Sequence, residues 1–360
     1  MVASLILSAC IKNGARLATA GEFSKRAVIN DRMDLSKAEA IAALIESKSE
    51  DAAKILAKQL RGDLGEFVDK LRSDLVETLA FVEVNIDYAE EDLDPNIMDM
   101  IDKKLDLNIS LLQKSLKASK NRDGLLNGFK IAIIGKPNVG KSSLLNSLLS
   151  YNRAITSDIA GTTRDTIEEQ IKIGTHLVKI VDTAGIREAD DELEKIGIDR
   201  SKSSIDESEI VLVLFDRSRA WSKDDDTILD LINEYEDKKK IIVLLNKDDL
   251  EDKLDLANII SFNPISISKD SSDVVMESLK EYLDSQSFED ELILINKRQI
   301  DSTQKALDSL LLSKGELNEG ELELFAFNIN ETIEEISSIT KAFERDEILD
   351  SMFSSFCLGK

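Results

Sequence analysis

The chain has 360 residues, enough for roughly two to three domains with sizeable hydrophobic cores. Its 46 basic and 70 acidic residues give a formal net charge of −24, which excludes a protein that binds nucleic acid or membrane through a broad basic surface. The chain has two cysteines, Cys10 and Cys357, near its opposite ends, and one histidine, His176, which excludes a disulfide framework and a metal cluster. No apolar run approaches the ~20 residues of a membrane-spanning helix. These features predict a cytoplasmic protein.

Helical periodicity runs from Asp34 to about Asn121, with apolar residues every three or four positions, as on one face of an amphipathic helix. Ser36 and Glu39 have the spacing of an N-terminal capping box, but Asp34 is an equally good cap. Pro95 interrupts the run, and a second helical stretch follows it. The segment predicts part of a helical bundle, whose repeating positions are Leu56, Leu60, Leu64, Phe67, Leu71, Leu75, Leu79 and Val82.

Short strand-like runs alternate with helical ones after a polar segment with two glycines at 121–128. This alternation predicts a mostly parallel sheet covered by helices. The helical period returns after Leu283. The strand-like runs are Phe129–Ile134, Ile171–Val181, Ile210–Phe215, Ile241–Leu245 and Pro264–Ile267.

The predicted architecture is an α/β domain inserted into an all-α helical domain. We expect a short remnant of an N-terminal α/β domain at 1–33, the helical domain at 34–126 and 287–360, and the inserted domain at 127–286. Three independent domains in a row are the alternative. Insertion is preferred because neither helical flank has the pattern of a segment that closes a core alone.

A phosphate-binding motif follows the first strand-like run. The segment Gly135-Lys-Pro-Asn-Val-Gly-Lys-Ser142 fits G-x-x-x-x-G-K-[ST], in which the glycines let successive backbone N–H groups point at phosphate oxygens. The lysine supplies a positive charge for the phosphates, and the serine hydroxyl is placed to bind Mg²⁺. We predict nucleotide contacts from Asn138, Val139, Gly140, Lys141, Ser142 and Ser143.

A base-reading motif, Asn246-Lys247-Asp248-Asp249, follows the run 241–245. The Asp249 carboxylate can accept hydrogen bonds from N1–H and the 2-amino group of guanine, a pair of donors that adenine lacks. The motif therefore predicts selection of GTP. Ser266, Ile267 and Ser268, at the end of the last strand-like run and directly after it, are also expected to bind GTP.

Two further motifs lie between these. Asp182-Thr-Ala-Gly185 is expected to contact Mg²⁺ and the γ-phosphate, and 161–165 (Gly-Thr-Thr-Arg-Asp) lies where a switch segment supplies a hydroxyl to the metal. The four motifs in this order predict a Ras-like GTPase domain. Ile186 stands where Ras-type enzymes have a water-orienting glutamine, so another residue has to do that work. The candidates are Arg187, Glu188, Glu192 and Glu194.

Motifs near both ends of the chain accompany the nucleotide-binding ones. They are Thr19-Ala-Gly-Glu-Phe-Ser-Lys-Arg26, Asp34-Leu-Ser-Lys-Ala-Glu-Ala40, Pro137-Asn138 in the phosphate loop, Ile159-Ala-Gly-Thr-Thr-Arg-Asp165, Asp182-Thr-Ala-Gly-Ile-Arg-Glu188 and Phe356-Cys-Leu-Gly-Lys360. Together they resemble the MnmE/TrmE family of tRNA-modification GTPases over nearly the whole chain. In that family the helical domain is interrupted by the GTPase domain.

The resemblance implies a homodimeric, potassium-stimulated GTPase. With an FAD-dependent partner of the MnmG/GidA type, the family adds a carboxymethylaminomethyl or aminomethyl group to C5 of the wobble uridine of certain tRNAs. The one-carbon donor is a tetrahydrofolate derivative bound by an N-terminal α/β domain. That domain normally begins well upstream of the position matching Met1, so most of the folate-binding and dimer-forming surface would lie outside this chain.

The resemblance also implies roles for single residues. Thr163 would bind Mg²⁺ together with Ser142, and Glu194 would orient the attacking water. Cys357 would act in tRNA modification rather than in GTP hydrolysis, and Arg32 and Lys360 would contact folate. The potassium ligands would be Asn138, Ser157, Ile159 and Thr162. The GTP contacts would include Ser157, Thr162, Thr163, Asp182 and Gly185. Arg164 and Asp165 would be further catalytic residues.

Two other functions remain open from the sequence. One is a GTP-regulated ribosome-assembly or interaction switch, in which the helical domain docks partners and Cys357 is inert. The terminal Phe-Cys-Leu-Gly-Lys argues against it. The other is a truncated form that hydrolyses GTP and modifies nothing.

Overall fold

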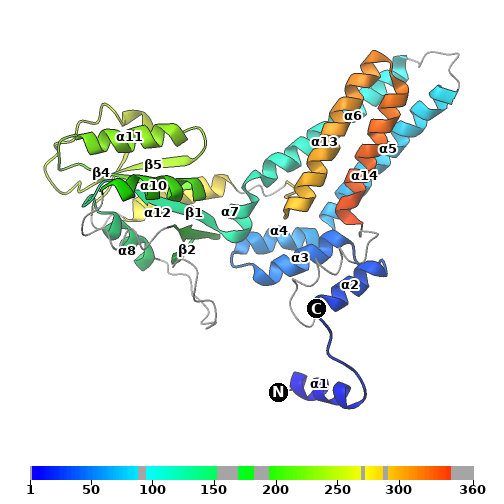
Figure 1. Ribbon diagram of the computed structural model, residues 1–360, viewed down its shortest axis with the longest axis horizontal. Helices are drawn as coiled ribbons and strands as arrows, with labels where there is room; N and C mark the ends of the chain where they lie inside the picture. Colours follow the sequence, from blue (N-terminus) through cyan, green and yellow to red (C-terminus); the bar gives the residue numbers. More distant parts are fainter. Residues whose placement is uncertain are drawn as a thin grey trace. The chain divides into compact units, whose positions relative to one another are not determined.

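The structure is a computed structural model that describes residues 2–87, 95–151, 169–181, 194–268, 272–286 and 291–341. Its contacts divide the chain into two compact units (Figure 1). The helical unit comprises 1–47, 53–122 and 290–360, and the α/β unit comprises 48–52 and 123–289. The limits predicted for the domains, at 33/34, 126/127 and 286/287, stay predictions.

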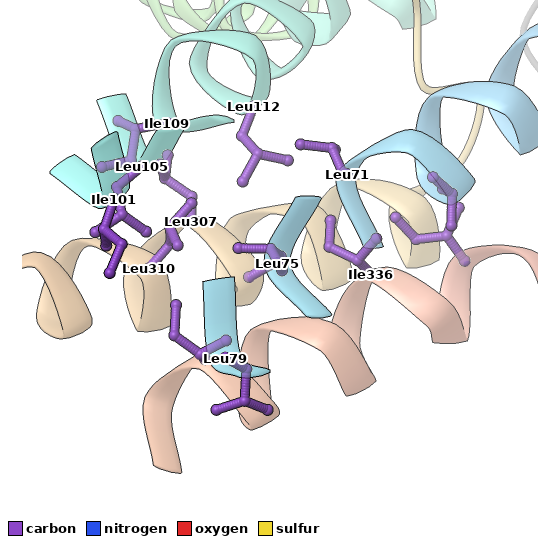
Figure 2. Close-up of a cluster of buried hydrophobic side chains, with 14 of the residues drawn as sticks. Leu71, Leu75, Leu79, Ile101, Leu105, Ile109, Leu112, Leu307, Leu310 and Ile336 are labelled. Carbon is purple, nitrogen blue, oxygen red and sulfur yellow. The ribbon is translucent and has the colours of Figure 1, made fainter. Parts of the chain in front are cut away.

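The helical unit is built on a bundle of four long helices, α5 (Asp63–Asp87), α6 (Pro95–Ala118), α13 (Lys297–Glu319) and α14 (Leu322–Thr340). Leucine and isoleucine side chains from all four helices meet in its core (Figure 2). Pro95 is the first residue of α6, where its missing N–H costs no intrahelical hydrogen bond. The shorter helices are α1 (Val2–Lys12), α2 (Glu22–Ile29), α3 (Leu35–Glu46) and most of α4 (Glu50–Arg61), with the 3₁₀ turn Ser119–Asn121.

The N-terminus of α3 corrects one expectation. Asp34 is the N-cap, and its Oδ1 accepts hydrogen bonds from the Lys37 N–H at 2.8 Å and the Ser36 hydroxyl at 2.6 Å. The Ser36–Glu39 capping box is therefore wrong, and the Asp34 alternative is confirmed. Glu39 instead accepts two hydrogen bonds from the Arg298 guanidinium, at 2.9 and 2.8 Å. A planar guanidinium is a stronger partner for a carboxylate than a backbone N–H.

Segments before and after the α/β unit hold the helical unit together. The buried side chain of Gln59 donates to the Ile293 carbonyl at 2.9 Å, and the Ser115 hydroxyl donates to the Leu292 carbonyl at 3.1 Å. Leu307 and Ile336 pack in the same core as residues of α5 and α6. The core of the helical unit thus contains side chains from both flanks of the inserted segment.

The α/β unit contains one six-stranded sheet in the order β2-β3-β1-β4-β5-β6 (Figure 1). All neighbouring strands are parallel except the pair β2–β3, which is antiparallel. This agrees with the predicted mostly parallel sheet and the Ras-like α/β fold class. The strands are β1 (Phe129–Ile134), β2 (Glu169–Ile173), β3 (His176–Ile180), β4 (Ile210–Asp216), β5 (Lys240–Asn246) and β6 (Ile265–Ser266).

The strand-like run at 171–181 is a hairpin of two strands in the structure. Strand β2 turns into β3 at Gly174 and Thr175, and Gly174 has a φ of +61°, a conformation that glycine adopts without strain. Periodicity could not separate the two strands, since only two residues lie between them.

Helices cover both faces of this sheet. Ile205 of α10 (Glu194–Glu207) and Leu231 and Ile232 of α11 (Lys223–Tyr235) pack on apolar residues of β4 and β5. Helices α8 (Lys141–Tyr151) and α12 (Ser272–Ser285) contact each other and β2. The remaining short elements are α7 (Arg122–Asn127) and the 3₁₀ turn Ile260–Phe262. Within the described ranges, no helix is long and apolar enough to cross a membrane, and no three His, Cys, Asp or Glu side chains group as metal ligands.

Candidate nucleotide-binding site

The loops after β1, β4, β5 and β6 leave the sheet at the same edge, because these strands are parallel neighbours. In open α/β sheets ligands bind outside this carboxyl edge. The phosphate-binding and base-reading motifs follow β1 and β5, so both lie at this edge.

The phosphate loop connects β1 to α8 and needs glycine at both motif positions. Gly135 has a φ of +148° and Gly140 a φ of +106°. A Cβ atom at Gly135 would lie 2.6 Å from the Leu214 carbonyl oxygen, and one at Gly140 would lie 2.1 Å from Nδ2 of Asn246. Both positions thus combine a left-handed backbone with a close approach that any side chain would block.

Lys141, the first residue of α8, points back into this loop. Its Nζ donates to the Gly135 carbonyl at 2.7 Å and the Lys136 carbonyl at 2.9 Å, and burial lowers the pKa of the ammonium. Carbonyl oxygens are neutral, so a phosphate oxygen would be a stronger partner for the same charge. The loop therefore fits a nucleotide phosphate.

The base-reading loop is hydrogen-bonded to the phosphate loop. Asn246 Nδ2 donates to the Val139 carbonyl at 2.8 Å, and Lys247 Nζ lies 3.3 Å from the Asn138 carbonyl. Lys247 also donates to the buried carboxylate of Asp216 at 2.6 Å. Burial alone would raise the pKa of Asp216, but hydrogen bonds from Lys247 and Ser218 outweigh it and hold that pKa below its usual value.

Arg217, in the loop after β4, contacts both the loop after β5 and strand β6. Its Nη1 donates to Asp248 and, at 3.0 Å, to the Ser266 hydroxyl, and its Nη2 donates to Asp252 at 2.8 Å. The hydrogen bond to Asp252 is the largest cause of a raised pKa of the guanidinium. Arg217 thereby ties the base-reading loop to β6, and the exposed Asp249 lies in the loop that it fixes.

Sequence reasoning missed Asp216 and Arg217. The signal that could have found them is the acidic and basic pair directly after the apolar run of β4. Their partners are 31 and 35 positions further along the chain, so local spacing did not connect them.

The structure brings together only part of the predicted site. Ser142 and Ser143 lie in the first turn of α8. Ile267 directly follows β6, and its N–H donates a hydrogen bond to the Leu245 carbonyl at 2.8 Å; Ser268 is the next residue. Glu194 is the first residue of α10. Arg32 is exposed in the helical unit. The predicted residues outside the described ranges are Ser157, Ile159, Thr162, Thr163, Arg164, Asp165, Asp182, Gly185, Cys357 and Lys360.

Comparisons with known protein families and curated sequences cover most or all of the chain. The family model "MnmE helical domain" matches residues 35–357. Proteins named tRNA modification GTPase MnmE from Sulfurimonas denitrificans and Aliarcobacter butzleri are 56% and 52% identical to this chain; each match covers 100% of this chain and 80% of the relative. A solved structure of Era from Aquifex aeolicus bound to GDP and AlF₄⁻ matches with 24% identity over 51% of this chain and 67% of that one, and its TM-score of 0.30 is too low to define the fold.

Proposed function

The chain belongs to the MnmE family of tRNA modification GTPases, and from this premise we propose that it hydrolyses GTP at the carboxyl edge of its sheet in the course of tRNA modification. One observation carries the proposal: the phosphate loop and the base-reading loop are hydrogen-bonded to each other through Asn246 and Val139. A nucleotide whose phosphates lie on the first loop therefore has its base within reach of the second.

Guanine selection is proposed for Asp249, with Asn246 and Lys247 shaping the pocket around it. The 2-amino group and N1–H of guanine fit a carboxylate acceptor, and adenine would leave that acceptor unpaired. Ser266, Ile267 and Ser268, at the end of β6 and directly after it, are proposed as further GTP contacts.

Mg²⁺ is proposed to be held by Ser142 and Thr163, with Asp182 nearby, and would neutralise charge on the phosphates. Its fit is supported by the hard oxygen donors in this set. The chain's own contribution is the positive charge of Lys141 and the backbone N–H groups of the phosphate loop, which bind and orient the phosphates.

Potassium is proposed to bind at Asn138, Ser157, Ile159 and Thr162. Of these, the described Asn138 fits in two respects: its side chain is exposed, and its left-handed backbone (φ +62°) is part of the phosphate loop. Glu194 would orient the water in place of the glutamine that Ile186 replaces, and Arg164 and Asp165 are proposed as further catalytic residues. A fixed cation beside the phosphates would do the electrostatic work of an arginine finger.

The modification step is proposed to be the addition of a carboxymethylaminomethyl or aminomethyl group to C5 of the wobble uridine, with an FAD-dependent MnmG/GidA-type partner and Cys357. We propose a cytoplasmic homodimer in which Arg32 and Lys360 contact a tetrahydrofolate derivative. With a net charge of −24, any tRNA contact would need a local basic patch or the partner's surface.

A GTPase assay in matched KCl and NaCl tests the hydrolysis proposal. We expect K⁺ to accelerate hydrolysis at least about tenfold over Na⁺, equivalent to about 1.4 kcal/mol of barrier. Asn138→Ala should abolish this difference, and Glu194→Ala should lower the rate by ~10² without changing GTP affinity.

Asn263→Ala is the matched control, because Asn263 is also exposed with a left-handed backbone (φ +50°) but lies outside the phosphate loop. Its K⁺ response should equal that of the wild type. Equal wild-type rates in both salts would reject the cation mechanism. They would favour the alternative of a ribosome-assembly or interaction switch that awaits an external activator.

A further inference from the structure

The second residue of the phosphate loop, Lys136, forms a buried ion pair with the first turn of α11. Its Nζ lies 2.6 Å from Oδ2 of Asp225, and the two side chains are only 9% and 1% exposed. Helix α11 follows β4, so the pair links the loop after one strand to the helix after its neighbour. None of the roles proposed above for GTP, Mg²⁺ or K⁺ uses the side chain of either residue.

The start of α11 is itself firmly held. Oδ2 of Asp225 also accepts hydrogen bonds from the Ser222 N–H at 2.9 Å and the Ser222 hydroxyl at 2.7 Å. The adjacent Trp221 stacks on the buried Phe215 of β4, with ring centroids 5.5 Å apart, and donates through Nε1 to Asp226 at 2.7 Å. Asp225 is thus an anchor fixed to the sheet.

The other end of the pair determines where a phosphate-loop carbonyl points. The Lys136 carbonyl is one of the two that accept from the Lys141 ammonium, at 2.9 Å. The side chain of Lys136 is therefore held by α11, while its backbone holds the phosphate-binding lysine. A shift of the Lys136 side chain would therefore displace its carbonyl and the Lys141 ammonium that this carbonyl holds.

The pair is poorly suited to a purely stabilising role. Oδ1 of Asp225 is buried and makes no hydrogen bond within the described part of the chain, a loss that costs stability. A buried ion pair often contributes no more stability than two apolar side chains of similar volume. Asp225 also caps α11 by accepting from Ser222, but that role does not require a lysine beside it, so the charge of Lys136 needs another explanation.

We propose that Lys136 and Asp225 are positioning residues, whose ion pair holds the phosphate loop in its nucleotide-binding conformation against α11. The proposal rests on GTP binding at this loop. The loop contacts phosphates in the ground state and in the transition state alike, so loss of its position weakens nucleotide binding and leaves the chemical step nearly unchanged.

The test measures GDP affinity in the full chain with the fluorescence of Trp221, the only tryptophan. Lys136→Met alone leaves the Asp225 carboxylate buried and unpaired, which endangers folding. The informative variant is therefore the double substitution Lys136→Met with Asp225→Asn, which removes both charges and keeps an oxygen to accept from Ser222. Lys136→Arg keeps the charge and is the conservative variant.

We expect the double variant to bind GDP about tenfold more weakly, as for the loss of one hydrogen bond to a charged group. KM for GTP should rise by the same factor, with kcat within about twofold of the wild type. Lys136→Arg, which keeps the charge, should retain most of the wild-type affinity for GDP. Thermal unfolding followed by Trp221 should show that the double variant is folded.

The matched control removes the exposed ion pair between Lys202 of α10 and Glu234 of α11, at 3.4 Å, with Lys202→Met and Glu234→Gln. Its GDP affinity should equal that of the wild type. Wild-type GDP affinity in the Lys136→Met/Asp225→Asn protein would overturn the inference and leave the pair a structural contact. Failure of the wild type itself to bind GDP would instead reject the proposed function.

Discussion

Replacement of Gly140 by alanine tests how closely the phosphate loop and the base-reading loop fit together. The backbone at Gly140 has a φ of +106°, and a non-glycine residue in such a left-handed conformation costs about 1–2 kcal/mol. The added Cβ would also lie 2.1 Å from Nδ2 of Asn246, well inside contact distance.

The size of the effect follows from these two contacts. Asn246 has to move, and it then loses the 2.8 Å hydrogen bond to the Val139 carbonyl, worth about 1 kcal/mol. The unbound loop can relax away from the strain, and nucleotide binding has to restore it, so both costs reduce affinity. Their sum of about 2–3 kcal/mol corresponds to about 30- to 150-fold weaker GDP binding.

Displacement of a fluorescent GDP analogue measures this affinity, and Gly174→Ala is the matched control. Gly174 also has a positive φ, +61°, but lies in the β2–β3 turn, where a Cβ would meet the Lys280 side chain at an ordinary 3.5 Å. The control should lose some stability and keep its GDP affinity. Wild-type affinity in Gly140→Ala, or an equal loss in Gly174→Ala, would refute the reasoning.

Three further predictions concern single groups. Asp249→Asn should weaken GTP binding and relax discrimination against XTP, because the amide adds a donor that fits the 2-oxo group of xanthine; unchanged GTP-over-XTP selectivity in displacement assays would contradict this. Cys357→Ser should leave GTP hydrolysis nearly unchanged and abolish wobble-uridine modification, because a hydroxyl cannot replace thiolate chemistry. The measurement is mass spectrometry of tRNA from a strain that carries the substitution in the full-length gene. Normal modification would exclude the catalytic role of Cys357. Asp216→Asn should destabilise the α/β unit at pH 7 but not in acid, as measured by urea unfolding followed by the fluorescence of Trp221. The lowered pKa of Asp216 gives stability that is present above its unfolded-state pKa and is lost as pH falls through its folded-state pKa. A difference from wild type that is equal at both pH values would contradict that role.

The sequence predicted the parts of the site that depend on local pattern. A glycine-rich motif after a strand and Asn-Lys-x-Asp after another strand are both local signals, and parallel strands bring their ends to one edge. The motifs therefore meet in the structure as expected, with Asn246 bonded to Val139. The helical flanks were equally readable, since apolar spacing along α5 and α6 reflects the face that each helix buries.

Two of the contacts that sequence reasoning missed join partners that are far apart in the chain. Glu39 had capping-box spacing, but the guanidinium of Arg298, 259 positions away, is its partner in the structure. Lys136 and Asp225 are 89 positions apart, and nothing in their local spacing connects them. The β2–β3 turn has a different cause, since only Gly174 and Thr175 separate the two strands and both strands belong to one strand-like run.

Charge pairing within the site explains how a chain of net charge −24 can bind a polyphosphate. Three of the cations in its described loops already have carboxylate partners: Lys136 pairs with Asp225, Lys247 with Asp216, and Arg217 with Asp248 and Asp252. Lys141 differs, since its hydrogen bonds go to the Gly135 and Lys136 carbonyls. A phosphate that binds Lys141 displaces neutral oxygens and breaks no ion pair, so the free energy of binding is not reduced by the cost of separating two charges. The paired cations hold the loops in place, and the nucleotide's charge is met by Lys141 and by the backbone N–H groups of the phosphate loop.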